Sequence, residues 1–431
     1  MEEERISSVI LDEAARLGAD EASCLVAEGI KTEVDYTGGR IGMIRTTFNH
    51  RVSVKVLFQK KKGIASLNRL DEDAVRAVVR DAVENAQSAL PDEAEGISDE
   101  TGHLTGDTGD READLDGMYD RFAEFLRDAK REFPAISFDS ATVDFTRGRR
   151  LYRNTNGVYL MSADGAYAFS AMFMGKDGEN TSSFSETYAS MRRPDRPFLD
   201  LGMTRTLLSN AVRQIRPRPV SGKFVGSLVL TPPCVEDFLA TVQSNFLDDG
   251  ALINGTSPYR NLLNCPVAAP CVTVHCLPRD ERMIDGYDMT GDGYVAQNMP
   301  LIENGILRNF TVSRYGSVKT GLARSANEGG CYAMTPGETS LDELIRGVER
   351  GVLVGRISSG APGSNGDITG VAKNSFLIEN GKITDALSET MISGNLADML
   401  KNVVGVSRET VSNGGFILPW VRTDGVTISG K

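Results

Sequence analysis

Histidine is the scarcest chemistry-bearing residue in this chain of 431 residues, which holds three: His50, His103 and His275. They stand isolated from one another and from any known motif. A histidine-based metallopeptidase site needs paired imidazoles at motif spacing, and a catalytic triad needs an imidazole between an acid and a nucleophile. The chain therefore cannot assemble either kind of site alone.

Positive charge, cysteine and long apolar runs are also in short supply. Lys and Arg total 47 against 59 Asp and Glu, a net charge of −12, which is the wrong sign for neutralising phosphates and disfavours nucleic-acid binding. No apolar run approaches the ~20 residues that span a bilayer, and the acidic amino terminus lacks the features of a signal peptide, so we expect a cytosolic protein. The six cysteines are sparse, as expected where thiols stay reduced: Cys24, Cys234, Cys265, Cys271, Cys276 and Cys331.

The length of the chain favours two domains, because single domains usually hold ~100 to 200 residues. Pro217 and Pro219 interrupt the chain between a Leu- and Val-rich helical segment and a new strand. We therefore expect an N-terminal domain over residues 1–218 and a C-terminal domain over residues 219–431.

Periodicity predicts helices and strands in the first domain. Apolar residues at helical spacing indicate helices at 4–17, closed by Gly18, and from Asp71, which is placed to cap the second. Alternation indicates strands at 21–36 and 51–58, joined to the next strand by a charged turn at 59–63. Residues 92–116, which include His103, are acidic and rich in Gly and Thr, and predict a surface loop.

A β-meander is predicted over 136–191. Its turn signals are Arg147-Gly148, Asn156-Gly157, Asp164-Gly165 and Lys176-Asp177-Gly178. A helix over 199–215 follows it.

The second domain is predicted to be rich in strands. It opens with a strand at 224–230 and a helix at 235–246, and a later helix at 340–350 begins with a capping box formed by Ser340 and Glu343. Helices and strands are segregated, so the class is α+β, with an N-terminal α/β domain that contains the meander and a C-terminal domain of mostly antiparallel sheet.

The densest group of soft metal ligands is Cys265, Cys271, His275 and Cys276. Zinc sites use ligand pairs two to four residues apart on a turn, whereas residues 271–277 have the pattern of a buried strand, whose neighbours point to opposite faces. Structural packing is the favoured interpretation.

Carboxylates offer a second candidate site. Asp285, Asp288 and Asp292 lie in a glycine-rich run that lacks the register of a calcium loop, and Asp248 with Asp249 follows a predicted helix. Turn formation and solvation are the favoured interpretations. A hydrolase that holds a hard cation with Asp248, Asp249, Asp288 or Asp292 stays open as an alternative. Glycines at 360, 363, 366 and 370 lack the Gly-Lys-Ser or Gly-Lys-Thr of a phosphate loop.

A series of short segments resembles the TldD/PmbA family, once called modulators of DNA gyrase, and more closely its PmbA (TldE) branch. The likeness spans nearly the whole chain, and the glycine turns Glu303-Asn304-Gly305 and Glu379-Asn380-Gly381 within it are typical of hairpins. The segments are 52–58, 63–66, 71–89, 153–158, 301–307, 313–317, 336–338, 341–345, 376–383 and 394–395.

In the TldD branch a His-Glu-x-x-x-His motif and a cysteine near the carboxyl terminus bind zinc. Residues 239–244 take the place of the motif here, and Leu239, Ala240 and Ser244 supply neither an imidazole nor a carboxylate base. The stretch 411–422 contains no cysteine. The resemblance therefore transfers no catalytic, metal or cofactor-binding residue to this chain.

The resemblance implies a partner role. We expect a subunit similar to the non-catalytic partner in a cytosolic TldD-type metalloprotease, which processes unfolded or ribosomally made peptides with zinc in the TldD-like subunit. Exposed strand edges could hold an extended peptide there. A stand-alone homodimer that binds peptides or regulates another protein is the alternative from a different class.

Overall fold

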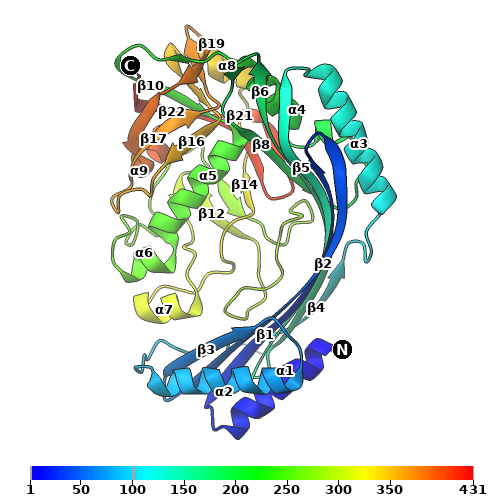
Figure 1. Cartoon of the computed structure of the whole chain (residues 1–431). Coiled ribbons are helices and arrows are strands. Elements are labelled where there is room, and N and C mark those ends of the chain that lie inside the picture. The colour runs from blue at the N-terminus through cyan, green and yellow to red at the C-terminus, as the bar shows by residue number, and fades with distance from the viewer. Residues whose placement is uncertain (1, 100–101, 431) are drawn as a thin grey trace.

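The computed structural model describes residues 2–99 and 102–430. A long, strongly curved sheet forms one side of the molecule, and a second, strand-rich domain lies within its curve (Figure 1). Helices α1 and α2 cover one end of the long sheet, and α3 and α4 cover the other. The class is α+β, as predicted.

The strands of the long sheet follow the order β3-β2-β1-β5-β6-β4, and β7 and β8 also pair with β6. All pairs are antiparallel except β4 with β6. The strands are β1 (Glu21–Thr37), β2 (Arg40–Phe58), β3 (Lys61–Leu67), β4 (His103–Thr108), β5 (Ile136–Asn154), β6 (Tyr159–Asp177), β7 (Asn180–Thr181) and β8 (Ser185–Met191).

The helices of this domain bury apolar stripes against one face of the sheet. In α2 the Asp71 side chain accepts a hydrogen bond from the Ala74 amide at 2.9 Å, which confirms the predicted cap. Gly18, with φ of 84°, ends the first helix as expected. The helices are α1 (Glu2–Arg16), α2 (Glu72–Ser88), α3 (Leu115–Glu132) and α4 (Thr204–Arg213), preceded by a short 3₁₀ turn (Phe198–Asp200).

Two of the predicted turns in the meander are wrong. Arg147 pairs with Gly165 and Gly148 with Asp164, so both dipeptides lie inside the continuous β5–β6 ladder. A Cβ atom on Gly165 would lie 1.9 Å from the carbonyl oxygen of Asp110, so this glycine allows a close approach of backbones rather than a turn. The turns at Asn156-Gly157 and Asp177-Gly178 are confirmed, with φ of 87° at Gly157 and 60° at Gly178.

The predicted acidic surface loop at 92–116 is wrong in part. Strand β4 lies within it, and His103 begins that strand with its ring stacked on Tyr159 at 5.2 Å between centroids. Glu95 is 4% exposed and forms ion pairs with Lys55 and Lys62. The strand pairs in parallel with a strand far away in sequence, and Glu95 is buried by its ion pairs. Neither feature produces a periodic pattern of apolar residues, which explains the error. Residues 100 and 101 of this stretch lie outside the described residues.

The second domain is built on a sheet whose main path runs β13-β12-β11-β14-β22-β10-β15-β18-β19-β9. Its strands pair mostly antiparallel, as predicted. They are β9 (Arg218–Pro219), β10 (Lys223–Leu230), β11 (Val274–Cys276), β12 (Met299–Glu303), β13 (Ile306–Leu307), β14 (Tyr332–Met334), β15 (Arg350–Val354), β16 (Arg356–Ser359), β17 (Asp367–Lys373), β18 (Phe376–Glu379), β19 (Lys382–Ser388), β20 (Met391–Asn395), β21 (Val403–Ser412) and β22 (Ile417–Ser429).

Helix ends in this domain differ from the predicted ones by a few residues. The Ser340 and Glu343 capping box is confirmed, but its helix ends at Arg346 because β15 begins at Arg350. The Asn-Gly hairpins at 304–305 and 380–381 are confirmed by positive φ at all four residues. The helices are α5 (Pro232–Val242), a π turn (Gln243–Leu247), α6 (Asp249–Ile253), α7 (Arg314–Thr320), α8 (Leu341–Arg346) and α9 (Leu396–Lys401).

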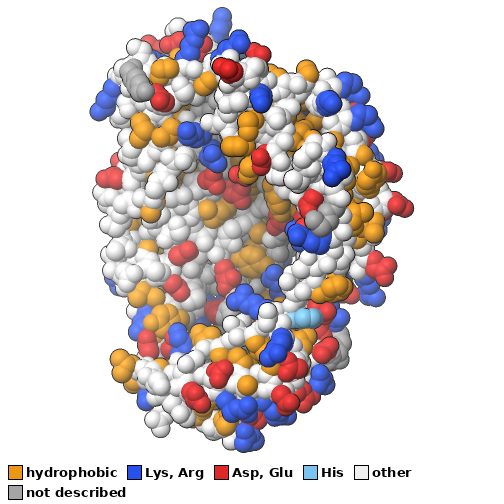
Figure 2. Space-filling view, viewed as in Figure 1, with side chains coloured by type: hydrophobic (Ala, Val, Ile, Leu, Met, Phe, Trp, Pro, Cys, Tyr) orange, Lys and Arg blue, Asp and Glu red, His pale blue; other side chains and the backbone are white. Residues whose placement is uncertain are grey.

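A long connection, residues 277–298, ties the second domain to the inner face of the long sheet. Ser162 of β6 donates to Asp288 at 2.6 Å, and the Tyr294 hydroxyl donates to Asp99 at 2.9 Å. Figure 2 shows the surface hollowed between the two domains, with acidic side chains gathered in the hollow. Described residues contain no helix with the length and apolarity to cross a membrane.

Phe169→Ala is expected to destabilise the first domain by about 3 to 5 kcal/mol, the usual cost of removing a buried phenyl ring. Phe169 is fully buried, and its ring packs on Phe125 and Phe198, each at 4.7 Å between centroids. Urea denaturation measures the loss. Met172→Ala, on the same strand at a residue that is 38% exposed, is the matched control and should cost far less.

Candidate functional site

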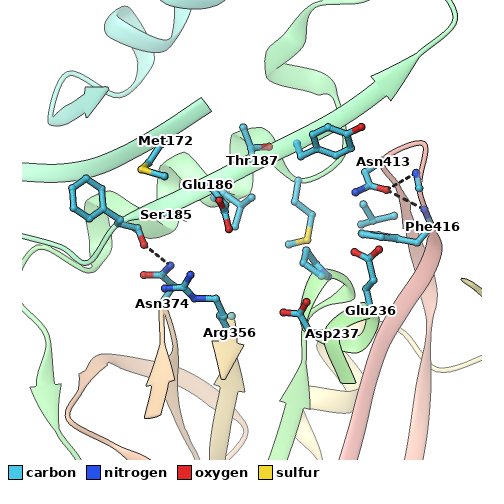
Figure 3. A pocket seen from close by; sticks show the side chains of 18 of the residues that line it. Met172, Ser185, Glu186, Thr187, Glu236, Asp237, Arg356, Asn374, Asn413 and Phe416 are labelled. Carbon is cyan, nitrogen blue, oxygen red and sulfur yellow. Dashed lines mark hydrogen bonds between the residues drawn. The ribbon is translucent and has the colours of Figure 1, made fainter. Parts of the chain in front are cut away.

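A cleft of about 310 Å³ lies between the two domains. Strand β8 and helix α4 of the first domain form one wall, and α5, β16 and the ends of β21 and β22 form the other. Figure 3 shows the labelled side chains of β8 on one side of this cleft, opposite Glu236, Asp237 and Arg356. The lining is mixed, because Phe184, Met203 and other apolar side chains lie beside the charged groups.

The main chain of β8 presents an unpaired edge to this cleft. The Ser190 amide points away from β6, because it donates to the Asn413 carbonyl at 2.8 Å. Successive residues of an antiparallel strand turn their amide and carbonyl groups to opposite edges, so Tyr188 and Glu186 share the orientation of Ser190. One step further, the Phe184 carbonyl accepts from Asn374 at 3.0 Å.

Between these two anchored ends, the main-chain groups of Glu186 and Tyr188 have no hydrogen-bond partner within the described parts of the chain. We call this stretch the β8 window, defined as the outward amide and carbonyl groups of Glu186 and Tyr188. Side chains at both positions are exposed. An extended chain can therefore pair with the window without displacing any other bond of the protein.

Acidic side chains surround the window. Burial, followed by the charges of Asp237 and Asp285, raises the pKa of Glu236 to about 7. Asp285 accepts hydrogen bonds from the Tyr188 hydroxyl at 3.2 Å, and burial raises its pKa as well. Burial also raises the pKa of Asp237, against the opposing charge of Arg356. The cleft therefore has the electrostatics of a site that favours cations or protonated carboxyls.

The helix that replaces the zinc motif borders this cleft, but its motif positions face elsewhere. Leu239 is 2% exposed and belongs to the core of the second domain. Ala240 has no donor atom for a metal, and the Ser244 hydroxyl donates to the Thr241 carbonyl of its own helix at 3.1 Å. These residues do not fit a zinc ion.

Gln243, next to Ser244, has every hydrogen-bonding position of its amide occupied. Its amide nitrogen donates to Asp248 at 3.1 Å and to the Glu328 carbonyl at 3.0 Å. Its oxygen accepts from the Gly330 amide at 3.2 Å and from the Tyr332 hydroxyl at 2.6 Å. The turn that follows α5 is thus held by a structural network.

The carboxylates of the alternative hydrolase lie in two places. Asp248, Asp249 and Asp292 line one depression, where Asp248 accepts from Thr311, Asp249 from Ser313, and Asp292 from Arg324 at 3.0 Å. Asp288 instead lies against Ser162 of the long sheet. Each of these carboxylates binds donors of the protein.

The remaining sequence candidates are dispersed. His50 lies on β2, His103 on β4 and His275 on β11. Of the soft ligands, Cys276 is buried and Cys271 exposed, while Cys265 lies outside any strand. Within residues 2–99 and 102–430, no group of three or more His, Cys, Asp and Glu side chains is arranged to hold a metal ion.

Three of the residues that line the cleft, Glu186, Tyr188 and Glu236, were not predicted from the sequence, whereas Asp285 was among the sequence candidates. Glu236 follows two prolines at the start of a helix, and that position alone says nothing of burial. The exposed pair on β8 does alternate with buried neighbours, which could have marked the strand, but not which of its edges is free.

Glu236→Gln is expected to raise the free energy of unfolding at about pH 8 and to change it little near pH 4. The pKa of Glu236 is about 7 in the folded chain against an ordinary value of 4.5, so the folded state retains a proton that the unfolded chain releases. Stability falls as the pH rises through that window, and glutamine removes the effect. Urea denaturation between about pH 4 and pH 8 measures the free energy of unfolding. The control is Glu84→Gln on the exposed face of α2. If both variants show the same pH dependence of stability, the raised pKa of Glu236 is contradicted.

Two family models and several known proteins are similar to this chain. The family model of the PmbA/TldA metallopeptidase C-terminal domain matches residues 222–430, and that of domain 1 matches residues 22–86. A metalloprotease PmbA homolog of Haemophilus influenzae is 25% identical over 406 residues, which cover 89% of this chain and 87% of that protein. Metalloprotease PmbA of Escherichia coli O157:H7 is 23% identical, with 98% and 96% covered.

Solved structures share the whole fold. TldE from Thermococcus kodakarensis superposes with a TM-score of 0.84 at 18% identity and covers 99% of this chain and 100% of that one. A Bacteroides thetaiotaomicron protein, described as a modulator of DNA gyrase, superposes with a TM-score of 0.85 at 21% identity and 99% coverage of both chains. Domain matches, relatives and fold agree: the chain belongs to the TldD/PmbA family.

Proposed function

We propose that the chain is a PmbA/TldE-like, non-catalytic subunit of a cytosolic TldD-type metalloprotease, and that it holds extended peptides along the β8 window. The observation that carries the peptide-holding role is the pair of outward amide and carbonyl groups at Glu186 and Tyr188, left open between two anchored ends. The substrates are unfolded or ribosomally made peptides, and the partner is a TldD-like subunit that binds the zinc.

The donor set at the motif helix supports a non-catalytic role. Zinc in proteases needs imidazole or carboxylate ligands and an open position for water, whereas Leu239 is a core residue and Ala240 carries no ligand atom. The Gln243 network holds the following turn through hydrogen bonds within the protein. Zinc chemistry is therefore assigned to the partner chain.

The shape of the cleft supports an extended substrate. A free strand edge binds the main chain of a peptide without reading its sequence, because every residue except proline offers the same amide and carbonyl groups. The apolar side chains of the wall, such as Phe184 and Met203, and the nearby carboxylates accept varied side chains. A wide range of unfolded peptides fits such a site.

Proteolysis of a disordered peptide should require the TldD-like partner. The experiment compares the pure chain, the pure partner and their mixture, and measures cleavage together with bound zinc by elemental analysis. We expect chelator-sensitive cleavage in the presence of the partner and none by this chain alone. Robust chelator-sensitive cleavage by the single chain contradicts the non-catalytic role, and function as a homodimer without any protease partner favours the stand-alone binding module.

Tyr188→Pro is expected to weaken binding of a fluorescein-labelled unstructured peptide roughly fivefold, the loss of one main-chain hydrogen bond of about 1 kcal/mol. The Tyr188 amide faces the cleft rather than β6, so proline removes the donor without breaking the sheet ladder. Fluorescence anisotropy measures the affinity.

The matched control is Tyr188→Ala, which removes the same side chain and its bond to Asp285 but keeps the amide. Circular dichroism and urea denaturation verify that both variants fold. Equal affinities of the proline and alanine variants would show that the peptide does not pair with this edge.

A further inference from the structure

The outer edge of β2 is unpaired along residues 40–51. β2 pairs with β1 along its inner edge, while β3 pairs with it only from Val52 to Phe58. Within the described chain, no main-chain hydrogen bond reaches the outer edge of residues 40–51. At about 3.4 Å per residue, this open edge is roughly 40 Å long.

Apolar side chains are exposed along this edge. Ile44 is 60% exposed and Phe48 is 65% exposed. Ile44 lies opposite the buried Val34 and Phe48 opposite Ile30, so both point to the face of the sheet that carries the helices. Ile30, which lies opposite Phe48, also lines a groove of about 480 Å³ on that face. The exposed surface at Phe48 therefore continues into this groove.

The edge has only part of the usual protection against strand pairing, namely a register shift between Ile41 and Ile44 and three arginines. Natural edge strands are short or bulged, carry proline or lysine, or are covered by another element. Residues 40–51 contain no proline and no lysine. Beyond the register shift, the edge from Ile44 to Arg51 keeps one register with β1. A long edge with exposed Ile and Phe is expected to be covered by a strand in the working form of the protein.

The charge of residues 40–51 determines what kind of strand can pair with this edge. The segment carries Arg40, Arg45 and Arg51 and no carboxylate, although the chain as a whole has a net charge of −12. Arg45 forms an ion pair with Glu33 of β1, so Arg40 and Arg51 supply the charge that a partner meets. If two copies paired antiparallel over residues 40–51, Arg40 would lie opposite Arg51, an unfavourable cross-strand pair. The edge is complementary to a different strand, one that carries acidic and apolar residues.

We propose that residues 40–51 of β2 form the docking edge for an extended strand of the TldD-like partner subunit. The docking strand presents apolar side chains to Ile44 and Phe48 and acidic side chains beside the arginines of the segment. This inference rests on the proposed function, because it takes the partner from it, but it concerns a surface separate from the β8 window.

Hydrogen exchange on the co-purified complex tests the docking edge. We expect the amides of residues 40–51 to exchange at least about tenfold more slowly in the complex than in the chain alone, because pairing protects them. The double variant Ile44→Asp with Phe48→Asp should weaken the complex at least about tenfold in analytical ultracentrifugation. Val318→Asp on α7, at a residue that is 55% exposed, is the matched control and should leave the affinity unchanged.

The outcomes separate this inference from the proposed function. A complex that forms without protection of residues 40–51, and that tolerates the double variant, overturns the docking edge and leaves the proposed function standing. A concentration-dependent dimer of this chain alone that protects the same residues overturns the choice of partner. Absence of any complex with the TldD-like chain overturns the proposed function and the docking strand together, while peptide binding at the β8 window is measured independently.

Discussion

The continuous β5–β6 ladder is the constraint on which the rest of the molecule depends. It runs from Ile136 paired with Gly175 to Arg153 paired with Tyr159, and it passes through Gly148 and Gly165 without a turn. Because the ladder is unbroken, one sheet carries the helices at both of its ends and also holds β8 against the second domain. A break at Gly165 would divide the sheet and remove the wall of the cleft.

The cleft is a product of that ladder and of the helix that opens the second domain. Strand β8 is held in position by its pairing with β6. At the two ends of its free edge, the Ser190 amide donates to the Asn413 carbonyl and the Phe184 carbonyl accepts from Asn374. Opposite, the second turn of α5 directs Glu236 and Asp237 into a partly desolvated space, where burial raises the pKa of both. Helix α5 supplies these carboxyl groups, and a closed hydrogen-bond network centred on Gln243 follows its end.

Local chemistry made much of this fold predictable. Caps and hairpins at Asp71, Ser340, Asn304 and Asn380 depend on neighbouring residues only, and all four are confirmed. The turn predicted at Gly165 was wrong because this glycine is required by a close contact with Asp110, which is far away in sequence. Strand β4 was missed because its pairing partner, β6, is also distant in sequence. Of the site, the sequence shows only which residue types stand at 239–244, whereas the raised pKa of Glu236 and the free edge of β8 arise from packing between domains.

The shortness of the β8 window has a kinetic consequence. Its two residues offer four hydrogen-bonding groups, and at about 1 kcal/mol each these correspond to roughly millimolar affinity. A peptide held so weakly dissociates rapidly, since differences in affinity appear mainly in the rate of release. Such an edge samples many chains in succession, and a peptide stays long enough to be cut only when a second surface holds it at the same time.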